Sequence, residues 1–363
     1  MASYIARRLL LMIPTLFGIM AISFLIIQFA PGGPVERMVA KLSGMDQSAT
    51  ATVSGAGDQQ FAEQDGGETS RYRGAQGLDP EFIAELEKMY GFDKPAHVRF
   101  FKMVGDFITF DFGESYYKDV KVIDLIASKL PVSISLGLWS TLLAYLISIP
   151  LGVRKAVRDG SAFDVWTSAV VVVGYAIPGF LFAVLLIVLF AGGTFLDIFP
   201  LRGLTSDNWE ELGFFAKIAD YFWHLVLPLA SLAISSFATL TLLTKNSFLD
   251  EIGKQYVVTA RAKGLSETRV LYGHVFRNAM LIVVAGFPAA FMAAFFTGAL
   301  LIEVIFSLDG LGLLSYESIV NRDYPVVFAS LFIFSLLGMV ATLIADIIYT
   351  LIDPRIDFEA RGA

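Results

Sequence analysis

Six long apolar stretches, each nearly free of charge, constrain this chain more than any other feature. A helix needs roughly 20 apolar residues to cross a bilayer core of about 30 Å. Inside a bilayer every backbone N–H and C=O must be bonded within the protein, so such stretches fold as helices. The sequence therefore predicts an all-α integral membrane protein with six transmembrane helices. The predicted spans are residues 9–30, 132–153, 165–190, 221–243, 280–302 and 326–352.

The composition agrees with a membrane protein and excludes several kinds of functional site. The chain is 56% hydrophobic and 17% charged, whereas soluble domains contain about 25% charged residues. It contains no cysteine, which excludes disulfides, cysteine-based metal sites and a thiol nucleophile. A net charge of −7 does not favour nucleic acid as a partner. The lipid bilayer is the partner that the composition predicts.

The distribution of Lys and Arg between the predicted loops indicates the orientation of the spans. Short cytoplasmic loops carry an excess of these residues, whereas long translocated loops largely ignore the rule. With the N-terminus inside, the inner segments carry thirteen and the short outer loops three. Both termini are therefore predicted to be cytoplasmic. The inner residues are Arg7, Arg8, Arg154, Lys155, Arg158, Lys245, Lys254, Arg261, Lys263, Arg269, Arg277, Arg355 and Arg361, and the outer ones are Arg202, Lys217 and Arg322.

The first span has a second interpretation, as a cleavable signal peptide. Arg7 and Arg8 precede its apolar run, as they would in a signal sequence. The run is about twice as long as a usual signal core. The best small residue for cleavage, Ala30, is followed at once by Pro31. We therefore predict an uncleaved anchor within residues 1–30.

The predicted outer segment, residues 31–131, lies between the first two spans and has two parts. Residues 43–77 are rich in Ser, Thr, Ala, Gly, Asp and Gln, which predicts a flexible segment. An Asp-Pro pair at 79–80 then predicts a short helix that ends at Gly91. The aromatic stretch from His97 onward is interpreted as a small packed cap, with a helix on the lipid surface as the alternative.

Residues 245–279 form a basic cytoplasmic segment with a helical pattern of its own. Apolar residues recur at helical spacing on two faces. Between them, Gly264 stands where a helix ends in a left-handed residue, and Ser266 can cap a second helix. An amphipathic face on this side requires the lipid surface or a partner protein, although the charges alone could serve to fix topology. The first face comprises Phe248, Ile252, Tyr256 and Ala260, and the second comprises Leu271, Val275 and Asn278.

Several motifs resemble the permease subunits of peptide-type ABC importers, a family of inner-membrane transport components that depend on binding proteins. TARAKG (259–264) followed by HVFRNA (274–279) resembles the cytoplasmic coupling loop, or EAA loop, of that family. The other matching motifs follow the family's order along nearly the whole chain. They are RRLLLMIP (7–14), PGGP (31–34), YGFDKP (90–95), FDFGES (110–115), IPGF (177–180), GLGLL (310–314), NRDYPVV (321–327) and DPR (353–355).

Two departures from the general pattern point to one branch of that family. The generic loop begins with Glu-Ala-Ala, whereas this chain has Val258, Thr259 and Ala260, as peptide-type members often do. Residues 43–77 look like an insertion relative to the shorter oligopeptide permeases. Such a long outer loop is similar to that of the larger B-type permease of the Yej importers. That branch takes up peptides and peptide-like antibiotics of the microcin C kind.

The resemblance also implies a division of labour and a domain organisation. The sequence has no Gly-x-x-x-x-Gly-Lys-[Ser/Thr] loop to cradle nucleotide phosphates. We therefore expect no enzyme activity, catalytic residue or cofactor in this chain, and we expect ATP and Mg²⁺ in separate cytoplasmic ATPase subunits. The expected segments are the anchor 1–30, the outer loop 31–131, a five-helix core 132–352 and a cytoplasmic tail 353–363.

The other implied partners are a second, similar permease chain and an extracytoplasmic peptide-binding protein, in a bacterial inner membrane. Loop 245–279 is expected to couple to the ATPase, with Ala260 on the docking face. Its expected coupling residues are Tyr256, Thr259, Ala260, Arg261, Lys263, Gly264, His274, Arg277 and Asn278.

Prolines and glycines in the spans mark candidate hinge or path residues. Pro178 and Pro288 can kink their helices, and Gly298 allows close helix approach. Either helix packing or a role in the translocation path explains all three. Asp346, the deepest acid, is interpreted as reaching toward the cytoplasm. The histidines have no metal-ligand spacing, so no metal site is predicted.

Three other classes of membrane protein fit the sequence less well. An ion-coupled secondary transporter is the main alternative, but it needs ionisable groups at mid-bilayer, where the predicted spans are uncharged. A membrane enzyme needs a cluster of His, Asp, Ser or Glu at one membrane surface, and the sequence shows none. A channel needs a filter loop or a charged ring, and Gly310 to Gly312 is too short to indicate one.

Overall fold

The structure is a computed structural model that describes residues 2–29, 88, 93–118, 120–191, 195–296 and 300–352. Within these ranges the chain is helical and contains no strand, only an isolated bridge between Glu114 and Lys121. The predicted insertion 43–77, the helix start at 79–80, Gly298 and the tail 353–363 lie outside the described residues.

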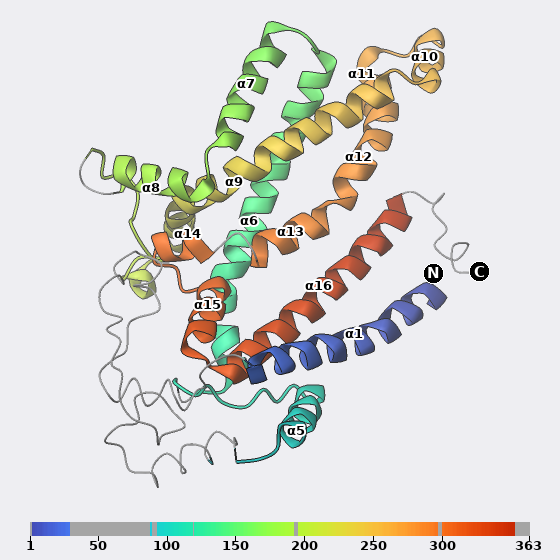
Figure 1. Cartoon of the computed structure of the whole chain (residues 1–363). Coiled ribbons are helices and arrows are strands. Elements are labelled where there is room, and N and C mark those ends of the chain that lie inside the picture. Colours follow the sequence, from blue (N-terminus) through green and yellow to red (C-terminus); the bar gives the residue numbers. More distant parts are fainter. Residues whose placement is uncertain are drawn as a thin grey trace, which may run out of the picture. The chain divides into compact units, whose positions relative to one another are not determined.

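Figure 1 labels the α-helices in their order along the chain. The helical elements are α1 (Ala2–Phe29), α5 (Ala96–Ile108), α6 (Val122–Val157), α7 (Ala162–Ala176), α8 (Gly179–Phe190), η1 (Trp209–Glu211), α9 (Phe214–Ile252), α10 (Gln255–Ala262), α11 (Glu267–Val270), η2 (Leu271–Val275), α12 (Phe276–Ala285), α13 (Phe287–Phe296), α14 (Leu300–Ile305), α15 (Leu311–Asn321) and α16 (Tyr324–Ile352).

The predicted all-α membrane fold is confirmed, and its crossings are of two kinds. Within the described residues, four helical stretches are long and apolar enough to cross a bilayer unaided. Two helix pairs reach that length only when taken together, because each pair is bent. The described residues therefore provide up to six spans if each pair counts as one. The single stretches are Ser3–Gln28, Val122–Val157, Glu267–Met292 and Tyr324–Ile348, and the pairs are Ala162–Ala176 with Gly179–Phe190 and Phe214–Ile234 with Ser236–Ile252.

The predicted span at 165–190 is not one helix but two. α7 and α8 meet at an angle of 96°. Ile177 is extended, with φ −86° and ψ 118°, because a residue before proline is pushed out of the α-helical region. Pro178 then begins α8 as its N-cap. The prediction of one continuous helix was wrong here because the proline ends the helix instead of kinking it.

The predicted span at 280–302 is also interrupted. α12 ends at Ala285, Gly286 forms the break, and α13 carries Pro288 as its second residue. A proline in the first turn of a helix loses no helical hydrogen bond, whereas in the interior it would. Pro288 is therefore compatible with a new helix, α13, that begins at Phe287. α12 and α13 still lie within one helical stretch, Glu267–Met292, that is long and apolar enough to cross a bilayer, and residues 297–299 before α14 lie outside the described residues.

Contacts divide the chain into two compact units. Unit 1 comprises Met1–Ala6, Pro131–Gly310 and Gly338–Ala363, and unit 2 comprises Arg7–Leu130 and Leu311–Leu337.

In unit 1, α9 packs against α7, α8 and α12. The approach of α6 to α9 requires a glycine at position 152. A Cβ built there would lie 2.6 Å from Cβ of Thr244 and 2.9 Å from the carbonyl oxygen of Thr241. Because no real Cβ contact is that short, Gly152 sets the distance between these two helices.

Unit 2 contains the aromatic cap that the sequence predicted outside the membrane. Phe107 of α5 packs edge-on against Phe112 at 4.8 Å and against Phe332 of α16 at 5.5 Å between ring centroids. Phe107 and Phe112 are both buried. The packed cap stays a prediction, because Phe107 packs on Phe332 of α16 while Phe101 and Ile108 of α5 are exposed, at 66% and 74%.

In the same unit, hydrogen bonds to Asp323 join two loops. The hydroxyl of Ser115 and the backbone N–H of Tyr116 both donate to the carboxylate of Asp323, at 2.5 and 3.1 Å. Asp323 precedes α16 and is buried. This carboxylate therefore ties the loop after α5 to the turn between α15 and α16.

Candidate functional site: the coupling segment and the cavity

The turn between α10 and α11 has the geometry that the sequence predicted for Gly264. Gly264 has a φ of +79°, in the region that glycine adopts at little cost. Its N–H donates to Arg261 O at 2.9 Å, and the N–H of Leu265 donates to Ala260 O at 3.3 Å. These two bonds form a Schellman motif, which closes the end of α10.

An ion pair spans the same turn on its outer side. Arg261 donates through Nε and Nη2 to both carboxylate oxygens of Glu267, at 2.9 and 3.0 Å. Bidentate arginine–carboxylate pairs fix orientation as well as distance. Because both side chains are exposed, the pair contributes at most about 1 kcal/mol of stability. Its main effect is to hold α11 in register with α10.

The helices of this segment are shorter and less capped than predicted. α9 ends at Ile252, so the predicted face from Phe248 to Ala260 is split between α9 and α10. Ser266 occupies the N-cap position of α11, but its side chain makes no capping hydrogen bond. A π-helical turn, η2, then interrupts the predicted second helix. The predicted helix–glycine–helix order and the cap at Gly264 are correct, and the predicted side-chain cap by Ser266 is wrong.

The apolar face of the segment points into the protein, which corrects the expected role of Ala260. Ala260 and Val257 of α10 are buried against Phe248 of α9 and Ala156 of α6. The sequence argument required lipid or a partner for this face, but the ends of the chain's own helices cover it. Ala260 therefore offers no docking surface.

The outward face of the segment carries most of the other predicted coupling residues. It also exposes two large apolar side chains that the sequence argument missed, Val258 and Tyr272, at 52% and 58% exposure. An alternation of buried Val257 and exposed Val258 gives no sequence signal, because both are valine. The exposed predicted residues are Thr259, Arg261, Lys263, Gly264, His274, Arg277 and Asn278.

Tyr256 is half-buried, and its hydroxyl bonds another residue of the same chain. Its hydroxyl donates to Glu251 at 2.7 Å, and Lys254 pairs with the other oxygen of the same carboxylate. Burial raises the pKa of the Tyr256 hydroxyl, with the Glu251 charge adding to the shift. The hydroxyl therefore keeps its proton and joins α10 to the end of α9.

A buried ionic cluster joins the nearby ends of α6, α7 and α9. Lys155 has no exposed side-chain surface and lies 3.0 Å from a carboxylate oxygen of Asp164. It also donates to Thr167 and Ser168 at 2.9 and 2.7 Å. Lys245 of α9 binds the other oxygen of Asp164 at 2.7 Å. Two residues counted as topology signals, Lys155 and Lys245, are thus structural ion-pair partners.

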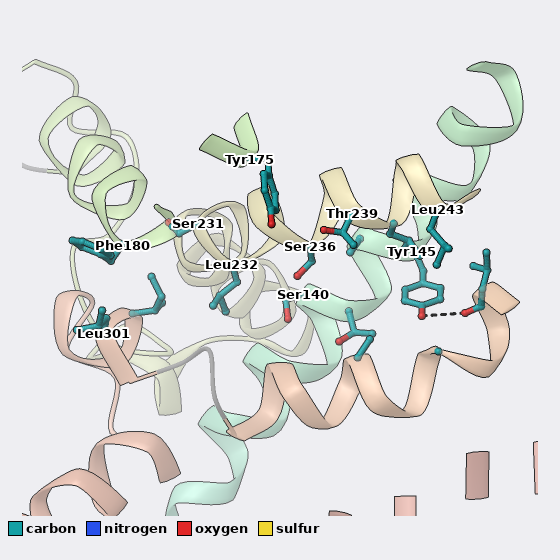
Figure 2. A pocket seen from close by; sticks show the side chains of 18 of the residues that line it. Ser140, Tyr145, Tyr175, Phe180, Ser231, Leu232, Ser236, Thr239, Leu243 and Leu301 are labelled. Atoms are coloured by element: carbon teal, nitrogen blue, oxygen red, sulfur yellow. Dashed lines mark hydrogen bonds between the residues drawn. The ribbon is translucent and has the colours of Figure 1, made fainter. Parts of the chain in front are cut away.

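A cavity of about 790 Å³ opens between the helices of unit 1. Figure 2 shows its hydroxyl side chains, with Tyr175 on α7, Ser140 on α6, and Ser236 and Thr239 on α9 facing the same space. Its volume falls within the range of pockets that hold small organic ligands. The lining residues are Ser140, Thr141, Ala144, Tyr145, Tyr175, Gly179, Phe180, Ser231, Leu232, Ser236, Thr239, Leu240, Leu243, Val283, Gly286, Ala290, Leu300, Leu301 and Ile302.

The helix breaks border this cavity. Pro178 lies at the bend between α7 and α8, and its neighbour Gly179 lines the cavity. Pro288 is buried beside the break at Gly286, which also lines it. The hydroxyl of Tyr145 donates to Val283 O at 3.2 Å (Figure 2). This bond satisfies a carbonyl at the broken end of α12, where an unpaired group in a bilayer is costly.

Metal chemistry has no candidate site in the part of the chain that the structure describes. No group of three or more His, Asp or Glu side chains lies close enough together there to hold an ion.

Comparison with known proteins identifies the class to which this arrangement belongs. The family described as "Binding-protein-dependent transport system inner membrane component" matches residues 148–358, which include the coupling segment and most of the cavity. The chain belongs to this family. It is a multi-pass inner-membrane permease of the ABC-importer type.

Named relatives match the chain over its whole length. It is 66% identical to the "Peptidoglycan transport system permease protein YejB" of Agrobacterium fabrum, over 99% of this chain and 100% of that protein. It is 58% identical to the "Inner membrane ABC transporter permease protein YejB" of Escherichia coli O157:H7, with the same coverage. It is 37% identical to the "Oligopeptide transport system permease protein AppB" of Bacillus subtilis, again over 99% and 100%. The predicted resemblance to the Yej branch is confirmed.

Proposed function

We propose that this chain forms half of the translocation path of an ATP-driven importer of peptides or peptide-like compounds. The observation that carries the proposal is the cavity in unit 1, which is lined by hydroxyl and apolar side chains from α6 to α14. None of its lining residues is Asp, Glu, Lys, Arg or His. The names of the relatives, which refer to peptidoglycan and oligopeptide transport, support a peptide-type cargo.

The alternative, an ion-coupled transporter, finds no acid or histidine in the lining of this cavity. Ion and proton relays use acids or histidines inside the bundle. Because the cavity lining offers no such group, ATP hydrolysis in partner subunits is the energy source that we propose.

The outward face of the segment from α10 to α12 is the proposed contact with a cytoplasmic ATPase. It combines exposed apolar groups, Val258 and Tyr272, with the exposed bases Arg261, Lys263 and Arg277. Apolar and aromatic anchors inside a polar rim are typical of protein interfaces. ATP and Mg²⁺ would then bind the partner and not this chain.

The same proposal assigns the remaining partners and the orientation. A second, similar permease chain completes the path, and an extracytoplasmic binding protein delivers the cargo. Both termini and the coupling segment face the cytoplasm, in keeping with the excess of Lys and Arg in the inner loops.

Uptake of a labelled peptide by cells with and without this gene tests the proposed function. Uptake should fall to background without the gene and return when the gene is restored. Equal uptake in both strains would contradict the proposal.

The coupling surface needs its own test in the assembled importer. Val258→Asp and Tyr272→Ala should release the ATPase during purification and abolish uptake, because each removes an exposed apolar group. Val258→Thr and Tyr272→Phe preserve shape and should retain the ATPase. Retention of the ATPase by all four variants would place the contact elsewhere.

A further inference from the structure

The hydroxyl groups of the cavity are not equivalent, because some are engaged within the protein and others are not. Ser231 donates to Leu227 O at 2.8 Å, Ser140 to Gly137 O at 3.3 Å, and Tyr145 to Val283 O. These three side chains satisfy carbonyl groups of the unit's own helices. They therefore belong to the wall of the cavity more than to its binding surface.

Thr141 differs from them. Its side chain is buried, with 4% exposure, and its hydroxyl has no hydrogen-bond partner among the described residues. Buried polar side chains nearly always have a partner, so each exception calls for an explanation such as a bound molecule. Thr141 lines the cavity, so a rotation of its side chain that turns the buried hydroxyl toward that space would give it a partner in whatever fills the cavity.

Ser236 and Thr239 complete this group from the facing helix. Both side chains are exposed on α9 and face the cavity in Figure 2. They lie one helical turn apart, so they are on the same side of α9. Thr141 of α6 and these two residues of α9 thus line one space from both sides.

We propose that Thr141, Ser236 and Thr239 form a charge-neutral cargo site that holds the backbone amide groups of a peptide. Each peptide residue except proline carries one N–H and one C=O, whatever its side chain. A hydroxyl both donates and accepts, so it can bond either group. The site therefore recognises peptides without selecting for the charge of their side chains. This inference rests on the proposed function.

The absence of charge in the lining makes this inference testable by adding charge. An ion introduced beside apolar walls interacts with a bound ion several times more strongly than it would in water. Thr239→Asp should therefore favour cationic cargo, and Thr239→Lys should favour acidic cargo. A residue that serves only for helix packing would produce no such reversal of sign.

The experiment uses the complete importer in proteoliposomes, with its partner permease, ATPases and binding protein. Three labelled peptides differ only at one position, which is Ala, Lys or Glu. Any preference of the binding protein is common to all variants, so it cancels when each variant is compared with the wild type. We expect Thr239→Asp to raise the Lys/Glu uptake ratio about tenfold and Thr239→Lys to lower it about tenfold.

Thr141→Val provides a second measurement, because it removes the hydroxyl and keeps the shape. Loss of an unpartnered buried hydroxyl should leave the thermal stability of the empty importer unchanged or raised. The half-saturating concentration of the neutral peptide should rise about threefold to tenfold. If Thr239→Asp fails to assemble, Ser236→Asp makes the same test from the same face of α9.

The possible results separate this inference from the proposed function. If the wild type takes up no peptide, the proposed function fails and the inference fails with it. If the wild type takes up all three peptides and the Asp and Lys variants leave their ratio unchanged, only the inference is overturned. A fall in stability of Thr141→Val with an unchanged half-saturating concentration would also overturn it, because Thr141 would then be structural.

Discussion

The hydroxyl of Tyr4, in the first turn of α1, donates a hydrogen bond of 2.7 Å to a carboxylate oxygen of Asp346, near the end of α16. Both residues belong to unit 1. The contact joins the beginning of α1 to the last turns of α16. We therefore predict that these two helix ends lie on the same side of a bilayer and that the number of crossings is even. The interpretation of Asp346 as an acid that reaches for cytoplasmic water missed this partner.

An even number of crossings predicts which sites a membrane-impermeant thiol reagent will reach. The chain has no natural cysteine, so single cysteines at positions 3 and 361 can be labelled one at a time. Both should react from the cytoplasmic side, and a cysteine at position 60 should react only from the outside. Labelling of positions 3 and 361 from opposite sides would contradict the Tyr4–Asp346 contact. Cytoplasmic labelling of position 60 would contradict the orientation.

A second prediction concerns the left-handed turn at Gly264. A Cβ at Gly264 or at Gly253 would meet no atom within 4 Å, but only Gly264 has a positive φ. Gly264→Ala should therefore cost about 1–2 kcal/mol in strain, and Gly253→Ala should cost nearly nothing. Gly264→Val should disturb the α10–α11 turn more strongly and reduce co-purification of the ATPase.

Thermal unfolding and ATPase retention, measured side by side, check this pair. Expression in the membrane should be the same for both glycine variants, because neither position lies inside a span. Equal behaviour of Gly264→Val and Gly253→Val would show that the turn geometry does not matter.

A third prediction contrasts the two acids of the ionic cluster. Asp164→Asn leaves the ammonium of Lys155 buried without its counter-ion, which should destabilise the protein by about 3–5 kcal/mol. Asp159 contacts Lys245 at 2.7 Å but is 53% exposed, so Asp159→Asn should cost less than about 1 kcal/mol.

Denaturation in detergent measures this difference, and a double variant provides the control. Adding Lys155→Met to Asp164→Asn removes the stranded charge and should restore part of the lost stability. A double variant that is no more stable than Asp164→Asn alone would show that the Lys155 charge is not the source of the cost.

A fourth prediction follows from the buried carboxyl of Asp323. Burial raises its pKa above the ordinary value of 3.8, with the Ser115 hydrogen bond opposing the shift. A raised folded-state pKa means that the native state favours the protonated form. The stabilisation by this group is thus complete below the unfolded-state pKa, and it is lost as the pH rises through the folded-state pKa.

Asp323→Asn removes this dependence while keeping an amide that can bond Ser115 and Tyr116. The melting temperature of the variant minus that of the wild type should therefore increase between about pH 4 and about pH 7. A difference that stays constant or decreases over this range would show that the ionised carboxylate is the form the native state prefers.

The sequence alone determined the class of fold and the turn at Gly264 in the proposed coupling segment. Long uncharged runs leave a chain in a bilayer no structure but helix, so the membrane fold followed without any tertiary information. The glycine at position 264 was equally informative, because a helix that ends in a left-handed residue has few alternatives. These features depend on local chemistry, which is why they could be predicted.

Only the tertiary structure decided which faces are covered and where helices break. Pro178 ends α7, whereas α9 continues through Pro228 while it packs against α7, α8 and α12. Val257 is buried and Val258 exposed, although the two residues are identical. The cavity hydroxyls come from helices far apart in the sequence, and their convergence depends on close approaches such as that of Gly152 to Thr244. Burial is a property of the assembled helices, so no single segment encodes it.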